Sequence, residues 1–280
     1  MNYRTILVHL DESPRCDVRV ELAARLAREH GAHLLGHAPA GLVNIPARVT
    51  PSATGTPNYL ELAQAHLDAR AEALVEAFRA RCTTLGVASF EGRCDEQDPV
   101  ESLVAQGRSC DLLVMSQNDP EAAIDAPDRD IAQQVMMRVG RPVLALPFVG
   151  TYPDIGRNVV IAWKDTREAT HAVNDALPLL RKANSVHLMC FERPSDSRHV
   201  TRLQLNDLRK WLERHGIEAQ LHQEAVRSGV GDKLLSRACD LGADLIVMGG
   251  YGHSRMAEFV LGGVTRTLLA HMTVPVLFSH

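Results

Sequence analysis

Short apolar runs alternate with longer amphipathic segments along the 280 residues of the chain. The runs at 112–115 and 245–248 are continuous rather than alternating, which is typical of strands covered on both faces of a parallel sheet. Between such runs, Leu and Ala recur at helical spacing over 17–29, 59–82 and 201–215. This order of strands and helices predicts a doubly wound α/β fold of the Rossmann type.

Four of the strand patterns occur twice, which predicts an internal duplication. The second copies of two of them begin 133 residues after the first, whereas the pattern at 6–11 returns 154 residues later at 160–165. The first half is therefore longer, and its extra residues lie near 39–60, where prolines cluster as in a surface loop. We predict two tandem domains, 1–150 and 151–280, each a five-stranded, mainly parallel sheet with helices on both faces. The repeated patterns are 6–11, 33–37, 110–115 and 141–145, which match 160–165, 186–190, 243–248 and 274–278.

Composition narrows the classes of function. The formal net charge is −4, which argues against a general binder of nucleic acid or of membrane surfaces, because both need a basic field. No apolar stretch approaches the ~18 residues of a membrane span. Six scattered cysteines form no Cys-x-x-Cys pair, and the thirteen histidines do not cluster at ligand spacing. We expect a cytoplasmic protein with free thiols and no metal site.

Glycines follow the apolar run at 245–248 and recur before a helical segment at 266–271. Such glycines let backbone amides approach an anion, and a helix N-terminus adds the positive end of its dipole. Two amide clusters around one crevice suit a polyphosphate, although tight strand-to-helix turns would explain the glycines equally well. The spacing matches neither a Walker loop nor the dinucleotide fingerprint. The residues concerned are Gly249, Gly250, Gly252, Gly262 and Gly263, with His253, Arg255 and Arg266 as sources of charge and Thr265 as a hydroxyl.

The spacing Gly249-x2-Gly252-x9-Gly262 closely resembles the ATP-binding motif of universal stress proteins. The aspartates after the first strands and the closing Val-Pro-Val-Leu resemble the same family, so the resemblance covers nearly the whole chain as two copies. It implies ATP, with or without Mg²⁺, in the second domain. It also implies the following contacts: Asp165 at the ribose or adenine side, backbone groups of Phe191 at the adenine, and Gly249, Gly252, Gly262 and Gly263 at the phosphates, with Val264 and Thr265 at the helix start.

Gly263 departs from the family pattern, which usually has Ser or Thr after the third glycine. The missing hydroxyl removes one hydrogen bond to a charged group, which is worth about 1.5–3 kcal/mol. We therefore expect ATP affinity to be lower by about an order of magnitude.

The first half lacks the glycines. At the 133-residue offset, Ser116 and Asp119 replace Gly249 and Gly252. Five carboxylates between 116 and 130 would repel a triphosphate. We predict that the first domain does not bind ATP by this route. Asp11 then has a helix-cap or turn role, and a cap role is an equal alternative for Asp165.

These features favour a stress-response regulatory protein that binds ATP, or a related adenine nucleotide, in its C-terminal domain with little or no hydrolysis. No residue is assigned a catalytic role. The alternatives are an interaction protein with a relict loop, and a slow ATPase or ATP-dependent ligase on the same fold. The resemblance also implies that the closing strands 143–146 and 276–278 pair, as in dimers of single-domain members, and it leaves a homodimer open.

Overall fold

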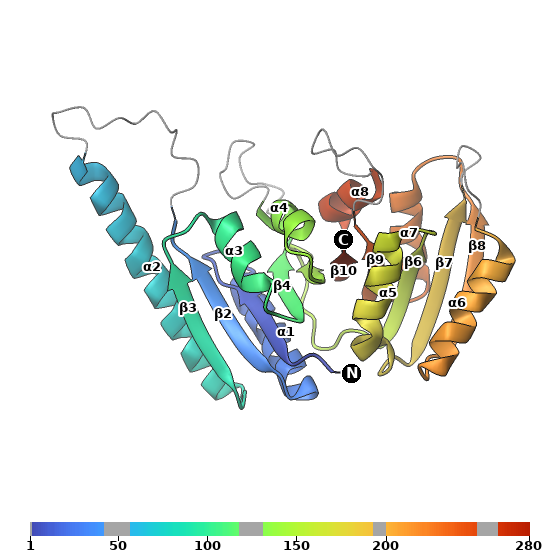
Figure 1. Cartoon of the computed structure of the whole chain (residues 1–280), viewed down its shortest axis with the longest axis horizontal. Helices are drawn as coiled ribbons and strands as arrows, with labels where there is room; N and C mark the ends of the chain where they lie inside the picture. Colours follow the sequence, from blue (N-terminus) through green and yellow to red (C-terminus); the bar gives the residue numbers. More distant parts are fainter. Residues whose placement is uncertain (1, 42–56, 118–130, 193–199, 251–262) are drawn as a thin grey trace. The chain divides into compact units, whose positions relative to one another are not determined.

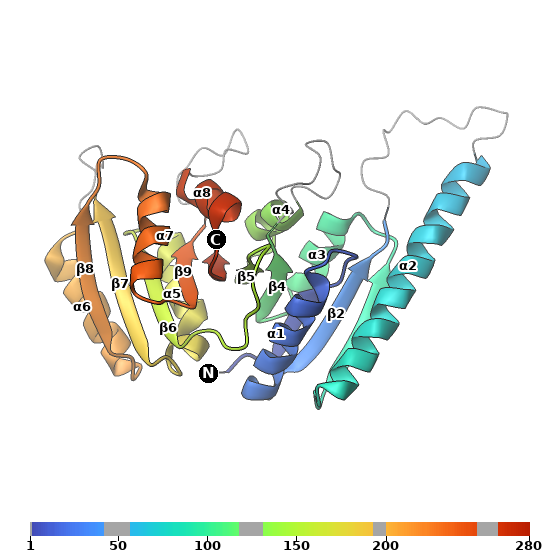
Figure 2. The ribbon, with the colours of Figure 1, turned by 180° about the vertical axis from the view of Figure 1, so that it is seen from behind.

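The computed structural model describes residues 2–41, 57–117, 131–192, 200–250 and 263–280. The chain divides into two compact units, 2–141 and 142–280. In each unit, strands alternate with helices that cover both faces of a mainly parallel sheet (Figures 1 and 2). The predicted doubly wound α/β class is therefore confirmed.

The unit 2–141 contains four parallel strands in the order β3-β2-β1-β4. Helices α3 and α4 cover the face seen in Figure 1, and α1 and α2 cover the face seen in Figure 2. The strands are β1 (Thr5–His9), β2 (His33–Pro39), β3 (Phe90–Asp95) and β4 (Leu112–Ser116). The helices are α1 (Cys16–His30), α2 (Pro57–Thr84), α3 (Pro99–Gly107) and α4 (Ile131–Arg138).

The unit 142–280 has the order β5-β10-β9-β6-β7-β8, in which only β5 runs antiparallel to its neighbour. Strand β5 closes the first sequence repeat and pairs with β10, with Leu144 opposite Leu277, as expected for the two closing strands. The strands are β5 (Val143–Leu146), β6 (Asn158–Trp163), β7 (Ser185–Glu192), β8 (Ala219–Ala225), β9 (Leu245–Gly249) and β10 (Val276–Ser279). The helices are α5 (Arg167–Leu180), α6 (Arg202–Arg214), α7 (Val230–Asp240) and α8 (Gly263–His271).

The apolar runs form the centres of both sheets. Strands β4 and β9 are buried at every position except their last residue, which explains why their sequences show no polar alternation. An aspartate before each of these strands fixes the start of the first strand of its repeat. Asp111 accepts the amides of Arg4 and Thr5 at 2.7 and 2.9 Å, and Asp244 accepts the amides of 156–158 at 2.8 to 3.2 Å.

The predicted helices at 17–29, 59–82 and 201–215 are present within about two residues at each end. Helix α8 starts at Gly263, three residues before the expected 266, because 263–265 already form its first turn. Much of the expected loop, 42–56, lies outside the described residues. None of the helices in the described ranges is long and apolar enough to cross a membrane.

The structure aligns the first strands of the two repeats, β1 and β6, with a shift of one residue relative to the sequence pattern. Leu7 pairs with Leu113 in the first unit and Val160 pairs with Ile246 in the second, so β1 matches β6 at an offset of 153 rather than 154. Strand β6 has 6 residues and β1 has 5. Asp11 and Asp165 therefore each lie two residues beyond the end of their strand.

Candidate functional site

The strand order reverses once within each parallel sheet, and open α/β sheets bind ligands outside the carboxyl ends of the strands at that point. In the unit 142–280 this switch point lies between β6 and β9, and in the unit 2–141 it lies between β1 and β4. Ala162 lies opposite Met248, so the strand ends that lead to Asp165 and Gly249 are neighbours. The fold alone thus brings two of the predicted site residues to one place.

Asp165 is exposed at the second switch point. Its Oδ2 accepts a hydrogen bond of 3.5 Å from Nε2 of Gln204, which lies in the first turn of α6. The capping alternative for Asp165 is wrong, because Thr166 caps α5 and its Oγ1 accepts the amide of Ala169 at 3.3 Å. The carboxylate of Asp165 is therefore not needed to start the helix, and it faces solvent.

Gly249 ends β9 against the first turn of α5. A Cβ atom at this position would lie 2.5 Å from the amide nitrogen of Ala169 and 2.6 Å from the carbonyl carbon of Glu168. Only glycine allows the strand and the helix to approach this closely. The structural alternative for the glycines therefore holds at Gly249, whether or not its backbone also meets a ligand.

The start of α8 supplies the helix N-terminus that the sequence predicts. Gly263 is exposed, and a Cβ added to it would meet no atom of the described residues within 4 Å. Val264 is half-buried, and Thr265 is buried with 3% of its surface exposed. The first amides of a helix have no intrahelical partner and carry the positive end of the dipole. This turn therefore carries backbone amides without intrahelical partners, while the Thr265 side chain packs inward.

Of the remaining predicted site residues, Phe191 lies in the part of the chain that the structure describes. Phe191 is the next-to-last residue of β7 and is half-buried; its neighbour Cys190 pairs with Trp163 at the end of β6. Phe191 thus lies one strand away from the switch point. Gly252, His253, Arg255 and Gly262 lie outside the described residues.

The switch point of the first repeat is filled by Arg19 of α1, whose side chain is fully buried. Its Nη2 lies 2.8 Å from Oδ1 of Asp11, Nε donates to the carbonyl of His9 at 2.7 Å, and Nη1 donates to Oγ of Ser116 at 2.7 Å. One guanidinium thus joins the end of β1 to the end of β4. Ser116 occupies the position of Gly249, so a side-chain bridge stands where the second repeat has close backbone contact.

Sequence reasoning missed Arg19, although one signal was present. The residue lies three and four positions before Leu22 and Ala23, on the apolar stripe of its helix. A charged residue on such a stripe is buried only when it is paired, so it indicates a partner elsewhere in the chain.

The carboxylate of Asp11 is held by several neighbouring groups. Its Oδ1 also accepts the amide of Ser13 at 3.0 Å and the Ser13 hydroxyl at 2.6 Å, which confirms the predicted turn role. The cap role is wrong, because the N-cap of α1 is Arg15, without a side-chain cap. Burial on its own would raise the pKa of Asp11, but Arg19 and His9 hold that pKa well below its usual range. Asp11 therefore stays ionised and paired.

The sequence model of the universal stress protein family matches residues 2–147 and 156–280. The chain belongs to this family. Its two matched segments correspond to the two sequence repeats, so it is a tandem universal stress protein.

Solved structures show the same fold at low identity. A universal stress protein from Archaeoglobus fulgidus superposes with a TM-score of 0.74 at 15% identity, covering 98% of this chain and 97% of that one. A functionally unknown protein from Pseudomonas aeruginosa has a TM-score of 0.58 at 17% identity, covering 99% and 92%. A universal stress protein in complex with cAMP covers 53% of this chain and 100% of its own, at 21% identity and a TM-score of 0.38. No curated protein matches the chain significantly.

A second polar cluster lies at the carboxyl ends of β2 and β3 in this tandem universal stress protein. His37 Nε2 lies 2.5 Å from Oγ of Ser102, and that hydroxyl lies 2.8 Å from both carboxylate oxygens of Asp95. The residue types suggest a hydrolase triad, but Ser102 stands between the other two and is fully buried together with His37. The cluster ties α3 to the two strands and offers no accessible nucleophile.

Proposed function

We propose that the second repeat binds an adenine nucleotide, ATP foremost, at the carboxyl ends of β6 and β9, with little or no hydrolysis. Nucleotide binding would regulate a stress response, because this unit would differ between its nucleotide-bound and nucleotide-free states. One observation carries the proposal: the aspartate of the second switch point is exposed, whereas that of the first is locked by a buried arginine. Both switch points belong to the same fold; Asp165 is exposed, whereas Asp11 is only partly exposed and is paired with Arg19.

The described residues suggest how a nucleotide would be held. The Asp165 carboxylate would accept hydrogen bonds from the ribose hydroxyls, and the end of β7 at Phe191 would offer backbone groups to the adenine. The first amides of α8 would face the phosphates, where the positive end of a helix dipole stabilises an anion. Among the described residues, no atom lies within 4 Å of a Cβ added at Gly263 beside those amides. Mg²⁺ would enter with the phosphates of ATP.

Two observations favour a second candidate, an interaction protein that binds no nucleotide. Gly249 is explained by packing against α5 alone, and Gly263 lacks the hydroxyl usual in the family. In that case the exposed strand ends of the second repeat would be inherited without being used.

The two candidates differ in what the purified protein contains and binds. The chain would be purified, denatured and analysed for released nucleotide by chromatography, and ATP, GTP and AMP would then be titrated by calorimetry. We expect measurable ATP binding, with adenine nucleotides preferred over guanine nucleotides. We expect the rate of ATP turnover to be near background. Absence of detectable affinity for any adenine nucleotide would overturn it in favour of the interaction protein, and rapid turnover would move the protein to the ATPase class.

A further inference from the structure

Two histidines on neighbouring strands face each other in the second repeat, away from the switch point. Nδ1 of His187 in β7 lies 3.1 Å from Nε2 of His222 in β8. His187 lies opposite Gln220 and Met189 lies opposite His222, so the pair is diagonal on one face of the sheet. His187 has 7% of its surface exposed and His222 is half-buried. The two rings are therefore held together with one side open to solvent.

The first repeat shows that the fold does not require this pair. By strand register, Leu35 occupies the position of His187, because Leu35 pairs with Leu7 as His187 pairs with Val160. Arg93 likewise occupies the position of His222. The same face of the first sheet is thus built from an apolar side chain and an arginine.

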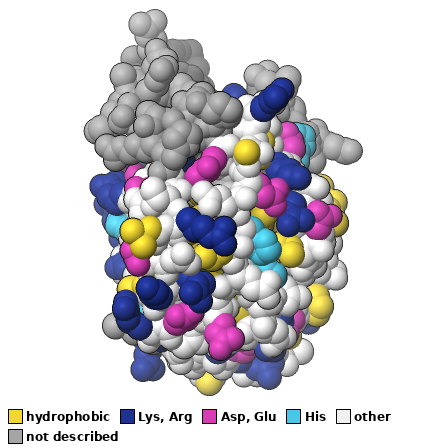
Figure 3. Space-filling view, turned by 90° about the vertical axis from the view of Figure 1, so that its right-hand side faces the viewer, with side chains coloured by type: hydrophobic (Ala, Val, Ile, Leu, Met, Phe, Trp, Pro, Cys, Tyr) yellow, Lys and Arg dark blue, Asp and Glu magenta, His cyan; other side chains and the backbone are white. Residues whose placement is uncertain are grey.

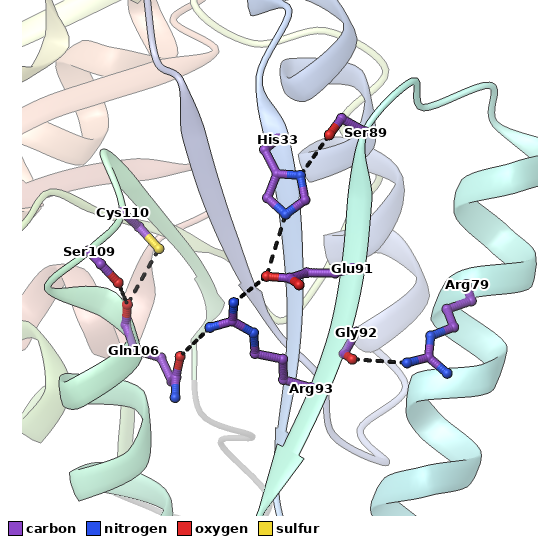
Figure 4. Close-up of polar contacts among 9 residues, drawn as sticks. All are labelled: His33, Arg79, Ser89, Glu91, Gly92, Arg93, Gln106, Ser109 and Cys110. Atoms are coloured by element: carbon purple, nitrogen blue, oxygen red, sulfur yellow. Dashed lines mark hydrogen bonds and ion pairs between the residues drawn. The ribbon is translucent and has the colours of Figure 1, made fainter.

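Figure 4 shows how that arginine is used. Arg93 contacts Glu91 on its own strand and donates to Oε1 of Gln106 in α3 at 3.0 Å, while His33 bonds Ser89 at 2.8 Å. Each polar group drawn on this face has a partner of complementary type. The histidine pair of the second repeat instead joins two rings of the same kind, which share one proton between the facing nitrogens.

Facing imidazole nitrogens are the ligands that Zn²⁺, Cu²⁺ and Ni²⁺ prefer. With metal–nitrogen bonds of about 2.0–2.1 Å, nitrogens 3.1 Å apart subtend roughly 100° at a shared metal ion. That angle lies between the ideal values for octahedral and tetrahedral coordination. Both ligating atoms are thus already at the separation that a bound ion would need.

The charges near the pair are balanced. Burial, followed by the neighbouring His222 and Arg237, lowers the pKa of His187. The positive charge of Arg237 is itself paired, since Nε lies 2.8 Å from Glu224 and Nη1 lies 3.3 Å from Asp240. Figure 3 shows the side of the molecule on which β8 and α6 lie in Figure 1, where histidines reach a surface of interspersed positive and negative side chains.

We propose that His187 and His222 form a two-histidine site for a divalent transition-metal ion, with Cu²⁺ bound most tightly, Zn²⁺ next, and water in the remaining positions. The order follows the general stability series of these ions. On binding, the ring that donates the shared hydrogen bond moves its proton to its other nitrogen, so both facing nitrogens become ligands. The site does not involve Asp165 or the start of α8, and it stands independently of the nucleotide proposal.

Metal binding by the full-length chain tests the site. The protein would be stripped with a chelator and titrated separately with Cu²⁺ and Zn²⁺, with His187→Gln, His222→Gln and the double variant in parallel. His171→Gln is the matched control, because His171 is exposed on α5 and outside the pair. Glutamine keeps a polar group of similar length, and circular dichroism would confirm that each variant folds.

The wild type and His171→Gln should bind one ion that either single variant of the pair loses or binds at least about tenfold more weakly, since even an outer-shell change costs about 10–100-fold in metal affinity. The double variant should lose less affinity than the sum of the two single losses, because the gain from chelation is lost only once. Paramagnetic resonance of bound Cu²⁺ should show two ligating nitrogens in the wild type. Unchanged metal affinity in His222→Gln, the half-buried and more tolerant position, would overturn the site, as would additive losses in the double variant.

Discussion

The two switch points of this chain share a fold and a first-strand aspartate but differ in what fills the space between the strand ends. In the first repeat, Arg19 bridges Asp11 and Ser116 with a fully buried guanidinium. In the second, Gly249 lets the backbone of α5 close against the strand, and Asp165 remains exposed. The first repeat pairs its aspartate with its own arginine, and the second leaves its aspartate exposed. The two repeats thus share the sheet, while the residues at their switch points differ.

The largest expected effect comes from removing the internal cation. Arg19→Met would keep most of the side-chain volume but leave Asp11 without its buried partner, and breaking a buried ion pair costs about 3–5 kcal/mol. Because 31% of the Asp11 side chain is exposed, we expect a loss of about 3 kcal/mol in the free energy of unfolding. Urea denaturation would measure it, with Arg28→Met at an exposed position of the same helix as control. Equal stability of the two variants would show that Arg19 does not hold the first switch point together.

The first repeat should also lose stability in mild acid. Burial lowers the pKa of His9 to about 4, from 6.5 in the unfolded chain. Between these values the unfolded chain binds a proton that the folded chain does not, so stability falls as pH drops through this window, by up to about 3 kcal/mol.

Urea denaturation at pH 7 and pH 4.5 would measure this loss. His9→Gln should remove part of the difference between the two pH values, whereas His171→Gln at an exposed position should keep all of it. A His9→Gln variant with the full pH dependence of the wild type would rule out His9 as its source.

A smaller effect is expected on ATP affinity at the second switch point. Gly263→Ser would place a hydroxyl at the start of α8, where an added Cβ meets no atom of the part of the chain that the structure describes within 4 Å. A hydrogen bond to a charged phosphate is worth about 1.5–3 kcal/mol, so ATP affinity should rise by about tenfold or more. Gly263→Ala is the control for the change in backbone freedom, and calorimetric titration gives both affinities. Equal gains in the two variants, or none in Gly263→Ser, would mean that phosphates do not lie against this turn.

Much of the fold followed from the sequence because buried parallel strands leave continuous apolar runs and a duplication repeats them. The position of Asp165 beside Gly249 could also be predicted, since both lie directly after such runs. The bridge through Arg19 could not, because its three partners lie up to 97 residues away and meet it only after the sheet forms. The same holds for His187 and His222, which are 35 residues apart and become neighbours only through the register of β7 and β8.

The packing role of Gly249 could not be predicted from the sequence alone. A glycine after a strand is compatible with a phosphate contact and with close packing, and only the position of α5 shows that packing requires it. Gly252, His253, Arg255 and Gly262 remain predictions, because they lie outside the described residues.

The contrast between the two aspartates is tested most directly by measuring ATP binding and unfolding in parallel for Asp165→Ala and Asp11→Ala. We predict one nucleotide per wild-type chain and about tenfold weaker ATP binding for Asp165→Ala with little change in its stability. For Asp11→Ala we predict lower stability with little change in ATP binding. Two nucleotides per chain, or a loss of ATP affinity in Asp11→Ala that matches the loss in Asp165→Ala, would contradict it.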